Sequence, residues 1–215
     1  MSRLQIHSVH PPAPGPLAQP EPLLSSEDGA VIAAELAAHG LRFERWPAHS
    51  ELTEDADQEA ILSAYAGEIV RIQGQGRYPS VDAIRLGPDH PDRQALRLKF
   101  LAEHTHAEDE VRFFVEGQGL FCLHIGEEVL QVLCTRGDLI AVPAGTRHWF
   151  DMGAAPRFTA LRFFENPEGW VAQFTGDSIA SRFPLLDPIS CASAAGGATG
   201  PVAGLPQRPA VPTAR

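Results

Sequence analysis

Two histidines and a glutamate stand close together in the segment EHTHAEDEVRFFVEG, residues 103–117. His104 and His106 are two residues apart, so on a β-strand both imidazoles point to the same side. Glu110 follows after a short turn, at the start of an apolar run. Imidazole and carboxylate groups together suit a divalent first-row metal ion. The segment therefore predicts part of a metal site, and the alternative reading is a solvated charged turn.

A further ligand is expected from GDLIAVPAGTRHWFDM, residues 137–152. Pro143 and Gly145 shape a turn there, and His148 opens the strand that follows. Three imidazoles and one carboxylate leave two positions of an octahedral ion for a chelating substrate. The predicted metal ligands are His104, His106, Glu110 and His148.

Strand alternation is expected to turn these side chains inward. The run ALRLKFLA, residues 95–102, is predicted to be a strand with its even-numbered residues in the interior. That inward set is Leu96, Leu98, Phe100 and Ala102, and its phase continues into His104 and His106. Glu103 and Asp109 have the opposite phase and are expected to be solvated or to brace the ligands from behind.

Two arginines are expected beside the metal. Arg112 shares the phase of Glu110, and in RFTALRFF, residues 157–164, the inward set is Phe158, Ala160, Arg162 and Phe164. Arginine keeps its proton in a buried pocket and can stabilise an anionic substrate. The alternative is a bulge that slips the register by one residue and puts Arg112 on the surface.

The elements before this region are expected to be an extended arm and two helices. Residues 1–22 are rich in proline and are predicted to form the arm. A helix is expected in residues 25–40, capped by Ser25 or Ser26, with acids in its first turn and Gly40 at its end. After a short strand in residues 41–46, residues 55–76 are predicted to be a second helix that packs outside the barrel.

From Val81 the apolar period changes to two, which predicts short antiparallel strands joined by turns. One of these turns is the GQG of residues 117–119. The expected fold is mainly β, an antiparallel jelly-roll barrel with a few peripheral α-helices. Residues 23–184 are predicted to form this single domain, and the Ala-, Gly- and Pro-rich residues 185–215 a disordered tail.

Charge and composition exclude several classes of protein. The formal net charge of −10 disfavours nucleic acid as a partner. No run approaches the roughly 20 apolar residues of a membrane span, and no signal peptide is recognisable. The three cysteines follow no disulfide pattern, which favours the reducing cytoplasm.

The ligand spacing resembles the two motifs of the cupin superfamily. His104-Thr-His106, Glu110 and Gly117 match the first motif, and Gly137, the turn of residues 143–145 and His148 match the second. The second motif usually ends in Asn, where this chain has Met152. More narrowly, KFLAEHTHAEDEVRFFVEGQG, HGLRFERW, AILSAY and SRFP resemble the acireductone dioxygenase family, over roughly residues 23–184.

This resemblance implies a cupin fold and a metal-dependent dioxygenase of methionine salvage. The implied substrate is 1,2-dihydroxy-3-keto-5-methylthiopentene, bound with O2 at one Fe²⁺ or Ni²⁺ per chain. The implied substrate-binding residues are Phe100, Arg112, Phe150, Arg162 and Trp170. Arg112 and Arg162 would stabilise charge, and Glu108 would assist deprotonation of the substrate. A monomer is expected, without a nucleic-acid or membrane partner.

Two alternatives use the same scaffold. A different cupin enzyme, such as a sugar-phosphate isomerase or a ring- or thiol-oxidising dioxygenase, would carry other wording around the ligands, and a phosphate site would want more basic residues. A non-catalytic sensor cupin would usually carry a basic helix-turn-helix domain. The predicted helices here are acidic and leave no room for such a domain.

Overall fold

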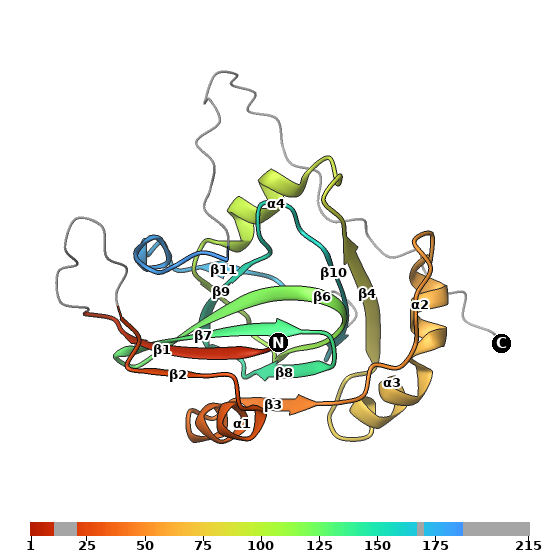
Figure 1. The fold of residues 1–215 in the computed structure, drawn as a ribbon, viewed down its shortest axis with the longest axis horizontal. Coiled ribbons are helices and arrows are strands. Elements are labelled where there is room, and N and C mark those ends of the chain that lie inside the picture. The colour runs from red at the N-terminus through yellow and green to blue at the C-terminus, as the bar shows by residue number, and fades with distance from the viewer. Residues whose placement is uncertain (11–20, 167–169, 187–215) are drawn as a thin grey trace.

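The computed structural model of the protein describes residues 1–10, 21–166 and 170–186. Strands dominate these ranges, and helices lie around them (Figure 1). In chain order the elements are β1 (Arg3–Ser8), β2 (Leu24–Ser26), α1 (Gly29–Ala38), β3 (Arg42–Arg45), α2 (Gln58–Ala64), α3 (Ala66–Gln73), β4 (Ser80–Leu86), α4 (Arg93–Phe100), β5 (His104–Thr105), β6 (Glu110–Ile125), β7 (Glu128–Thr135), β8 (Asp138–Val142), β9 (Arg147–Asp151), β10 (Phe158–Phe164), β11 (Gln173–Phe174) and the 3₁₀ turn η1 (Ile179–Arg182).

The long strand β6 organises the sheets. Its first half pairs with β8 and β10, and its second half pairs with β7 and β9, all antiparallel. From the second half the ladders continue through β1 and β2 on one side and through β5 and β11 on the other. The mainly β class with peripheral helices is therefore confirmed, although the ladders among the described residues form an open path rather than a closed ring.

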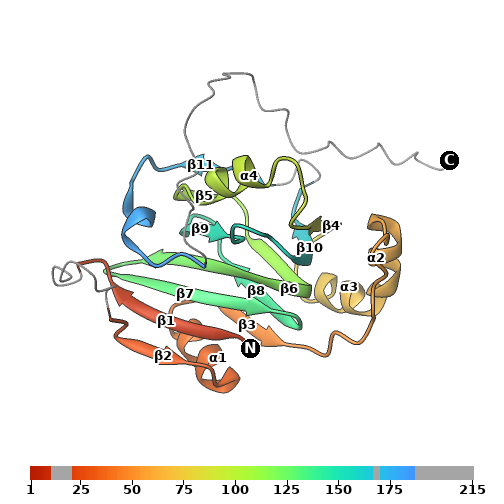
Figure 2. The same cartoon turned by 45° about the horizontal axis from the view of Figure 1, so that its top comes forward.

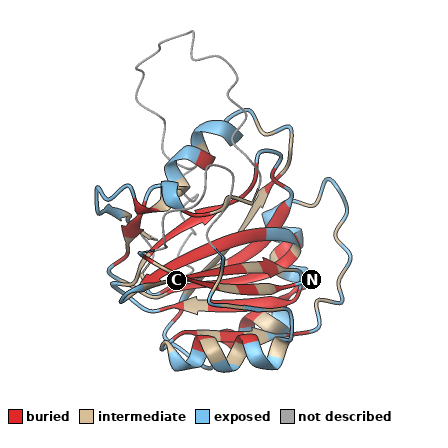
Figure 3. Ribbon diagram, turned by 60° about the vertical axis from the view of Figure 1, so that its left-hand side comes forward, coloured by how far each residue is buried: buried red, intermediate tan, exposed pale blue. Residues whose placement is uncertain are grey.

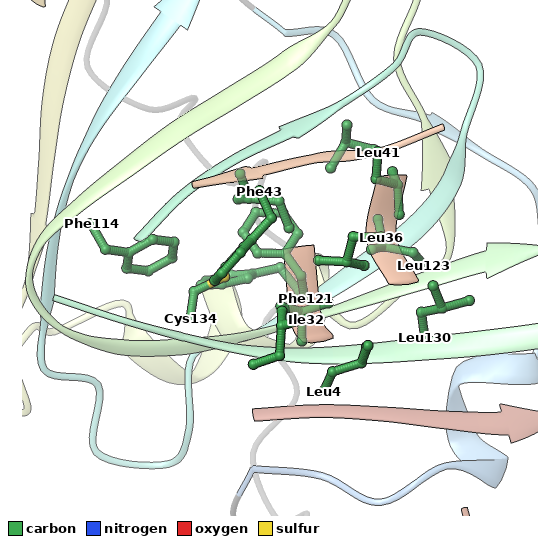
Figure 4. Close-up of a cluster of buried hydrophobic side chains, with 14 of the residues drawn as sticks. Leu4, Ile32, Leu36, Leu41, Phe43, Phe114, Phe121, Leu123, Leu130 and Cys134 are labelled. Atoms are coloured by element: carbon green, nitrogen blue, oxygen red, sulfur yellow. The ribbon is translucent and has the colours of Figure 1, made fainter. Parts of the chain in front are cut away.

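The main core lies between the strands and is closed at one end by α1. Phe114, Phe121 and Leu130 from the strands meet Ile32 and Leu36 from the helix (Figure 4). A second apolar layer forms on the outside, where α2 and α3 pack against the odd-numbered side chains of β6 and β10. The strands are largely buried, while the outer faces of the helices are exposed (Figure 3). The predicted packing of these helices on the outside is confirmed.

The helix boundaries differ from the predicted ones. Asp28 caps α1, its carboxylate accepting from the amides of Ala30 and Val31, so neither Ser25 nor Ser26 is the cap. The serines instead belong to β2, which pairs with β1. The predicted second helix breaks at Tyr65 into α2 and α3, because Tyr65 leaves helical geometry as its side chain turns into the core.

The beginning of the chain is more regular than predicted. Residues 3–8 of the expected arm form β1, which pairs with β7 over six positions. Leu4 and Ile6 alternate into the core, and this burial precedes the prolines. Residues 11–20 of the expected arm and residues 187–215 of the expected tail lie outside the described residues.

Residues 95–102 do not form the predicted strand. Residues 93–100 form α4 instead, so the apolar alternation does not set one inward face. Leu98 is 55% exposed, whereas Arg97 is 5% exposed and lies against Asp151 of β9. The segment is rich in residues that favour a helix, and Arg97 pairs with a residue far along the chain. These two factors favour the helix over the strand that the period-two pattern predicts. The histidines consequently stand on their own short strand, β5, and at its exit.

The predicted turn at residues 117–119 is a bend inside β6. Gly117 has φ +67°, and a Cβ there would lie 1.7 Å from the carbonyl oxygen of Arg157. The pairing with β7 continues directly from Gln118. Glycine is therefore needed for close approach and not for a chain reversal.

The Arg97–Asp151 pair gives a prediction about stability. Its distances are 2.7 Å (Nε–Oδ1) and 2.9 Å (Nη2–Oδ2), and both side chains are buried. Arg97→Met leaves a buried carboxylate without its cation, so the free energy of unfolding should fall by about 3–5 kcal/mol. Urea unfolding measures this. Arg42→Met, which breaks a half-buried pair with Glu44, should cost no more than about 1 kcal/mol; equal losses would contradict the prediction.

Candidate metal centre

Three strands bring the four predicted ligands together. His104 lies on β5, Glu110 begins β6, His148 lies on β9, and His106 follows β5 directly. Strand pairing sets His104 opposite His148. One ligand atom from each of the four residues lies within 4.8 Å of the others, and all four residues are buried. Figure 2 shows β5 and β9 beneath α4.

Backbone carbonyls fix the orientation of each imidazole. The Nδ1 atoms lie 2.7 Å from the oxygen of Ala102 for His104, 3.1 Å from that of Val171 for His106, and 2.8 Å from that of Thr146 for His148. A carbonyl oxygen only accepts, so each Nδ1 carries the proton and each Nε2 keeps a lone pair. Metal-binding histidines use this arrangement. The three imidazoles and the carboxylate therefore fit one divalent ion.

The carboxylate of Glu110 is held in its charged form. Burial opposes ionisation, but the neighbouring charge of Arg112 and the contacts with His106 and His148 keep the pKa of this carboxyl well below its usual value. The Nε2 atoms of these histidines lie 3.0 and 3.1 Å from Oε2, and Nε of Arg112 lies 2.7 Å from Oε1. The centre thus presents a charged oxygen donor.

Burial, followed by the nearby His148, lowers the pKa of His104 from 6.5 to about 4. A lowered folded-state pKa stabilises the fold above pH 6.5, and this stabilisation is lost as the pH falls towards 4. The metal-free protein should lose about 2 kcal/mol of unfolding free energy from this group between pH 7 and pH 5. Urea titrations at the two pH values measure the loss. His104→Gln should show a correspondingly smaller difference; an unchanged difference would contradict the assignment to His104.

The predicted substrate-binding residues surround the guanidinium of Arg112. Its Cζ lies 4.8 Å from the ring centroid of Phe150 and 5.3 Å from that of Trp170. Phe100, at the end of α4, contacts Phe150 with the ring centroids 6.5 Å apart. Arg162 is paired in register with Arg112 and lies 5.8 Å from the Trp170 ring. The five side chains come together as expected from the sequence, and their contact with substrate stays a prediction.

A cavity of about 130 Å³ adjoins the centre at His106. Glu108, Asn166, Trp170 and Gln173 also line it. The Oε2 atom of Glu108 is buried there and accepts no hydrogen bond from the described residues. A carboxylate oxygen thus lies beside the cavity that adjoins the metal centre.

Comparison with known proteins supports a family assignment. The sequence model described as the ARD/ARD' family matches residues 22–172, which include all four candidate ligands. The chain belongs to the ARD/ARD' family. This membership confirms the resemblance predicted from the ligand motifs and from the sequence around them.

Relatives within the ARD/ARD' family are similar over most of the chain. An acireductone dioxygenase of Prochlorococcus marinus (strain MIT 9303) is 66% identical over 187 residues, covering 86% of this chain and 100% of the relative. One from Synechococcus sp. (strain ATCC 27144 / PCC 6301 / SAUG 1402/1) is 68% identical over 167 residues, covering 77% and 92%. A solved acireductone dioxygenase from Bacillus anthracis, with a cadmium ion in its active centre, aligns with a TM-score of 0.67 and 27% identity over 81% of this chain and 98% of that one.

The sequence placed two acids near this ARD/ARD' centre incompletely or not at all. Glu103, expected either to be solvated or to brace the ligands from behind, is buried and accepts from Nδ1 of His124 and Oγ1 of Thr175, both at 2.6 Å. Asp82 of β4 pairs with Arg162. Its phase offered a signal, since Asp82 alternates with Ile84 and Leu86, which face the main core.

No helix in the described part of the chain is long and apolar enough to cross a membrane.

Proposed function

We propose that this chain is a metal-dependent dioxygenase that cleaves the acireductone 1,2-dihydroxy-3-keto-5-methylthiopentene with O2. The observation that carries the proposal is the buried cluster of three oriented imidazoles and one charged carboxylate beside a buried arginine. Family membership supports the substrate, because curated relatives of high identity are named acireductone dioxygenase.

The metal ligands in this proposal are His104, His106, Glu110 and His148. A bound ion would supply Lewis acidity and two open positions for the oxygens of an enediolate. The ligand side chains remain fixed by the backbone carbonyls and by strand pairing, so little reorganisation is needed when substrate arrives.

The substrate-binding role falls to the residues around Arg112. Arg112 and Arg162 would hold the anionic oxygens, since guanidinium groups keep their charge and bind oxygens in a planar fork. Phe100, Phe150 and Trp170 would cover the thioether arm. These rings and the buried position of Arg112 exclude water, which strengthens the charge interaction.

Glu108 is the candidate general base. None of the described residues hydrogen-bonds its Oε2, which lies at the cavity beside His106. In this position it could accept the proton that the enediol releases on binding. The partly exposed setting allows the carboxyl to pass that proton to solvent afterwards.

Two product sets follow from two metals in this proposal. With Fe²⁺ the products would be formate and 4-methylthio-2-oxobutanoate, the precursor of methionine. With Ni²⁺ they would be formate, carbon monoxide and 3-methylthiopropionate. The same four ligands suit either ion, so metal availability decides between them. We expect the protein to be a monomer that binds one ion per chain. We expect it to act in methionine salvage in the cytoplasm.

The deciding experiment is reconstitution with each metal separately. Loss of the ultraviolet absorbance of acireductone under O2 gives the rate, and product analysis gives the cleavage pattern. Consumption with either ion is the expected result. A protein that binds one metal ion but consumes no acireductone with Fe²⁺ or Ni²⁺ would overturn the proposed function and favour a binding protein or a different cupin enzyme.

A further inference from the structure

Asp82 and Arg162 form a two-pronged ion pair at the edge of the candidate substrate site. The residues stand opposite each other in the pairing of β4 with β10. Nε of Arg162 donates to Oδ1 of Asp82 at 2.8 Å, and Nη2 donates to Oδ2 at 2.6 Å. Both side chains are largely buried, at 17% and 16% exposed. This geometry fixes the plane of the guanidinium, because the two hydrogen bonds form together only in one orientation.

The same guanidinium faces a second one. Arg112 is the register partner of Arg162 on the other side of β10, and the ring of Trp170 lies close to both groups. Two cations this close repel each other in a poorly hydrated setting. Glu110 balances Arg112 but also belongs to the metal cluster. Asp82 supplies the corresponding negative charge for Arg162.

We propose that Asp82 is a positioning residue for the dioxygenase reaction, holding Arg162 charged and oriented towards the anionic part of the substrate. Asp82 acts through Arg162 and does not itself touch substrate. Its fork occupies Nε and Nη2, so the opposite edge of the guanidinium remains for an oxygen ligand. The inference rests on the proposed function and names a residue that the ligand motifs do not contain.

Asp82→Asn removes the charge while keeping the size of the side chain. The KM for acireductone should rise about tenfold or more, because Arg162 is no longer held in one orientation, while kcat changes less. Metal per chain and the urea midpoint should stay close to wild type, which separates positioning from a structural defect. Asp82→Glu, which keeps the charge, should recover part of the lost affinity.

Glu116→Gln is the matched control. Glu116 lies on β6 and pairs at 3.0 Å with Arg85, which lies on β4 as Asp82 does; this pair is more exposed than that of Asp82 and Arg162. It also accepts a hydrogen bond from Thr159 of β10 at 2.7 Å. Breaking this pair disturbs the same three strands away from the metal cluster, so the KM should remain that of wild type.

A double-mutant cycle tests whether Asp82 acts through Arg162. In an Arg162→Ala background, adding Asp82→Asn should change the KM by less than about twofold, since coupled residues are not additive. Fully additive effects, or a wild-type KM in Asp82→Asn, would overturn the inference while leaving the proposed function intact. A wild-type protein that consumes no acireductone with either metal would instead overturn the proposed function, and the assignment of Asp82 with it.

Discussion

His106→Ala is expected to strip the metal from the protein and abolish turnover. The side chain supplies one of four candidate ligand atoms, and the 3.1 Å contact from its Nδ1 to Val171 holds it in place. Losing an outer-shell partner already weakens metal binding by about 10- to 100-fold. Loss of a direct ligand should therefore exceed 100-fold. Metal content after dialysis against a weak chelator, measured by plasma emission, gives the result directly.

Two further variants separate metal loss from other effects of the substitution. His106→Gln retains bulk in the site, so circular dichroism and a urea titration can separate metal loss from misfolding. His10→Ala is the control, because His10 is exposed and its contact with Glu127 lies on the surface. One ion per chain in His106→Ala would show that His106 is not a ligand.

Arg112→Ala is expected to keep the metal and lose the substrate. Arg112 lies 2.7 Å from Glu110 and is surrounded by the rings of Phe121, Phe150 and Trp170. Removing a preorganised charge from such a site should lower kcat/KM by about 100- to 1000-fold. Steady-state kinetics of the metal-loaded variant measures this.

The lysine variant adds a test of shape. Arg112→Lys keeps a positive charge but loses the planar fork, so it should recover only part of the activity. Arg85→Ala removes an arginine from the same sheet in a half-exposed pair and should leave kcat/KM unchanged. Wild-type kinetics in Arg112→Ala would exclude contact between Arg112 and the substrate. Loss of metal from that variant would instead show that Arg112 is needed to hold Glu110.

The sequence predicts the ligands better than the elements that carry them. His104, His106, Glu110 and His148 follow from residue type, spacing and motif, which are local properties. The strand expected at residues 95–102 is wrong: in the helix that forms instead, Leu96 and Phe100 share the face towards the core, and Leu98 lies on the exposed side. What decides between them is the pairing of Arg97 with Asp151, 54 residues away. No local pattern contains that partner.

The acids near the site share this non-local character. The sequence leaves Glu103 either solvated or braced behind the ligands, and only His124, 21 residues further on, and Thr175 decide between the two. Asp82 lies 80 residues before Arg162. Its inward phase was readable from the sequence, but the need for its charge became clear only once Arg162 was placed opposite Arg112. A buried charge predicts that its partner carries the opposite charge, but it does not predict where in the sequence that partner lies.

The continuity of β6 determines how the centre can move. One uninterrupted strand carries Glu110 at its start and bonds to four neighbours along its length. The backbone of Glu110, anchored in this way, cannot shift unless the central ladder opens, and such openings need free energies close to that of global unfolding. Hydrogen exchange at residues 111–115 and 120–124 should therefore be equally slow, whereas the exposed residues 173–178 should exchange far faster. The backbone that carries the oxygen ligand then stays still, while the exposed segment of residues 173–178 opens more readily.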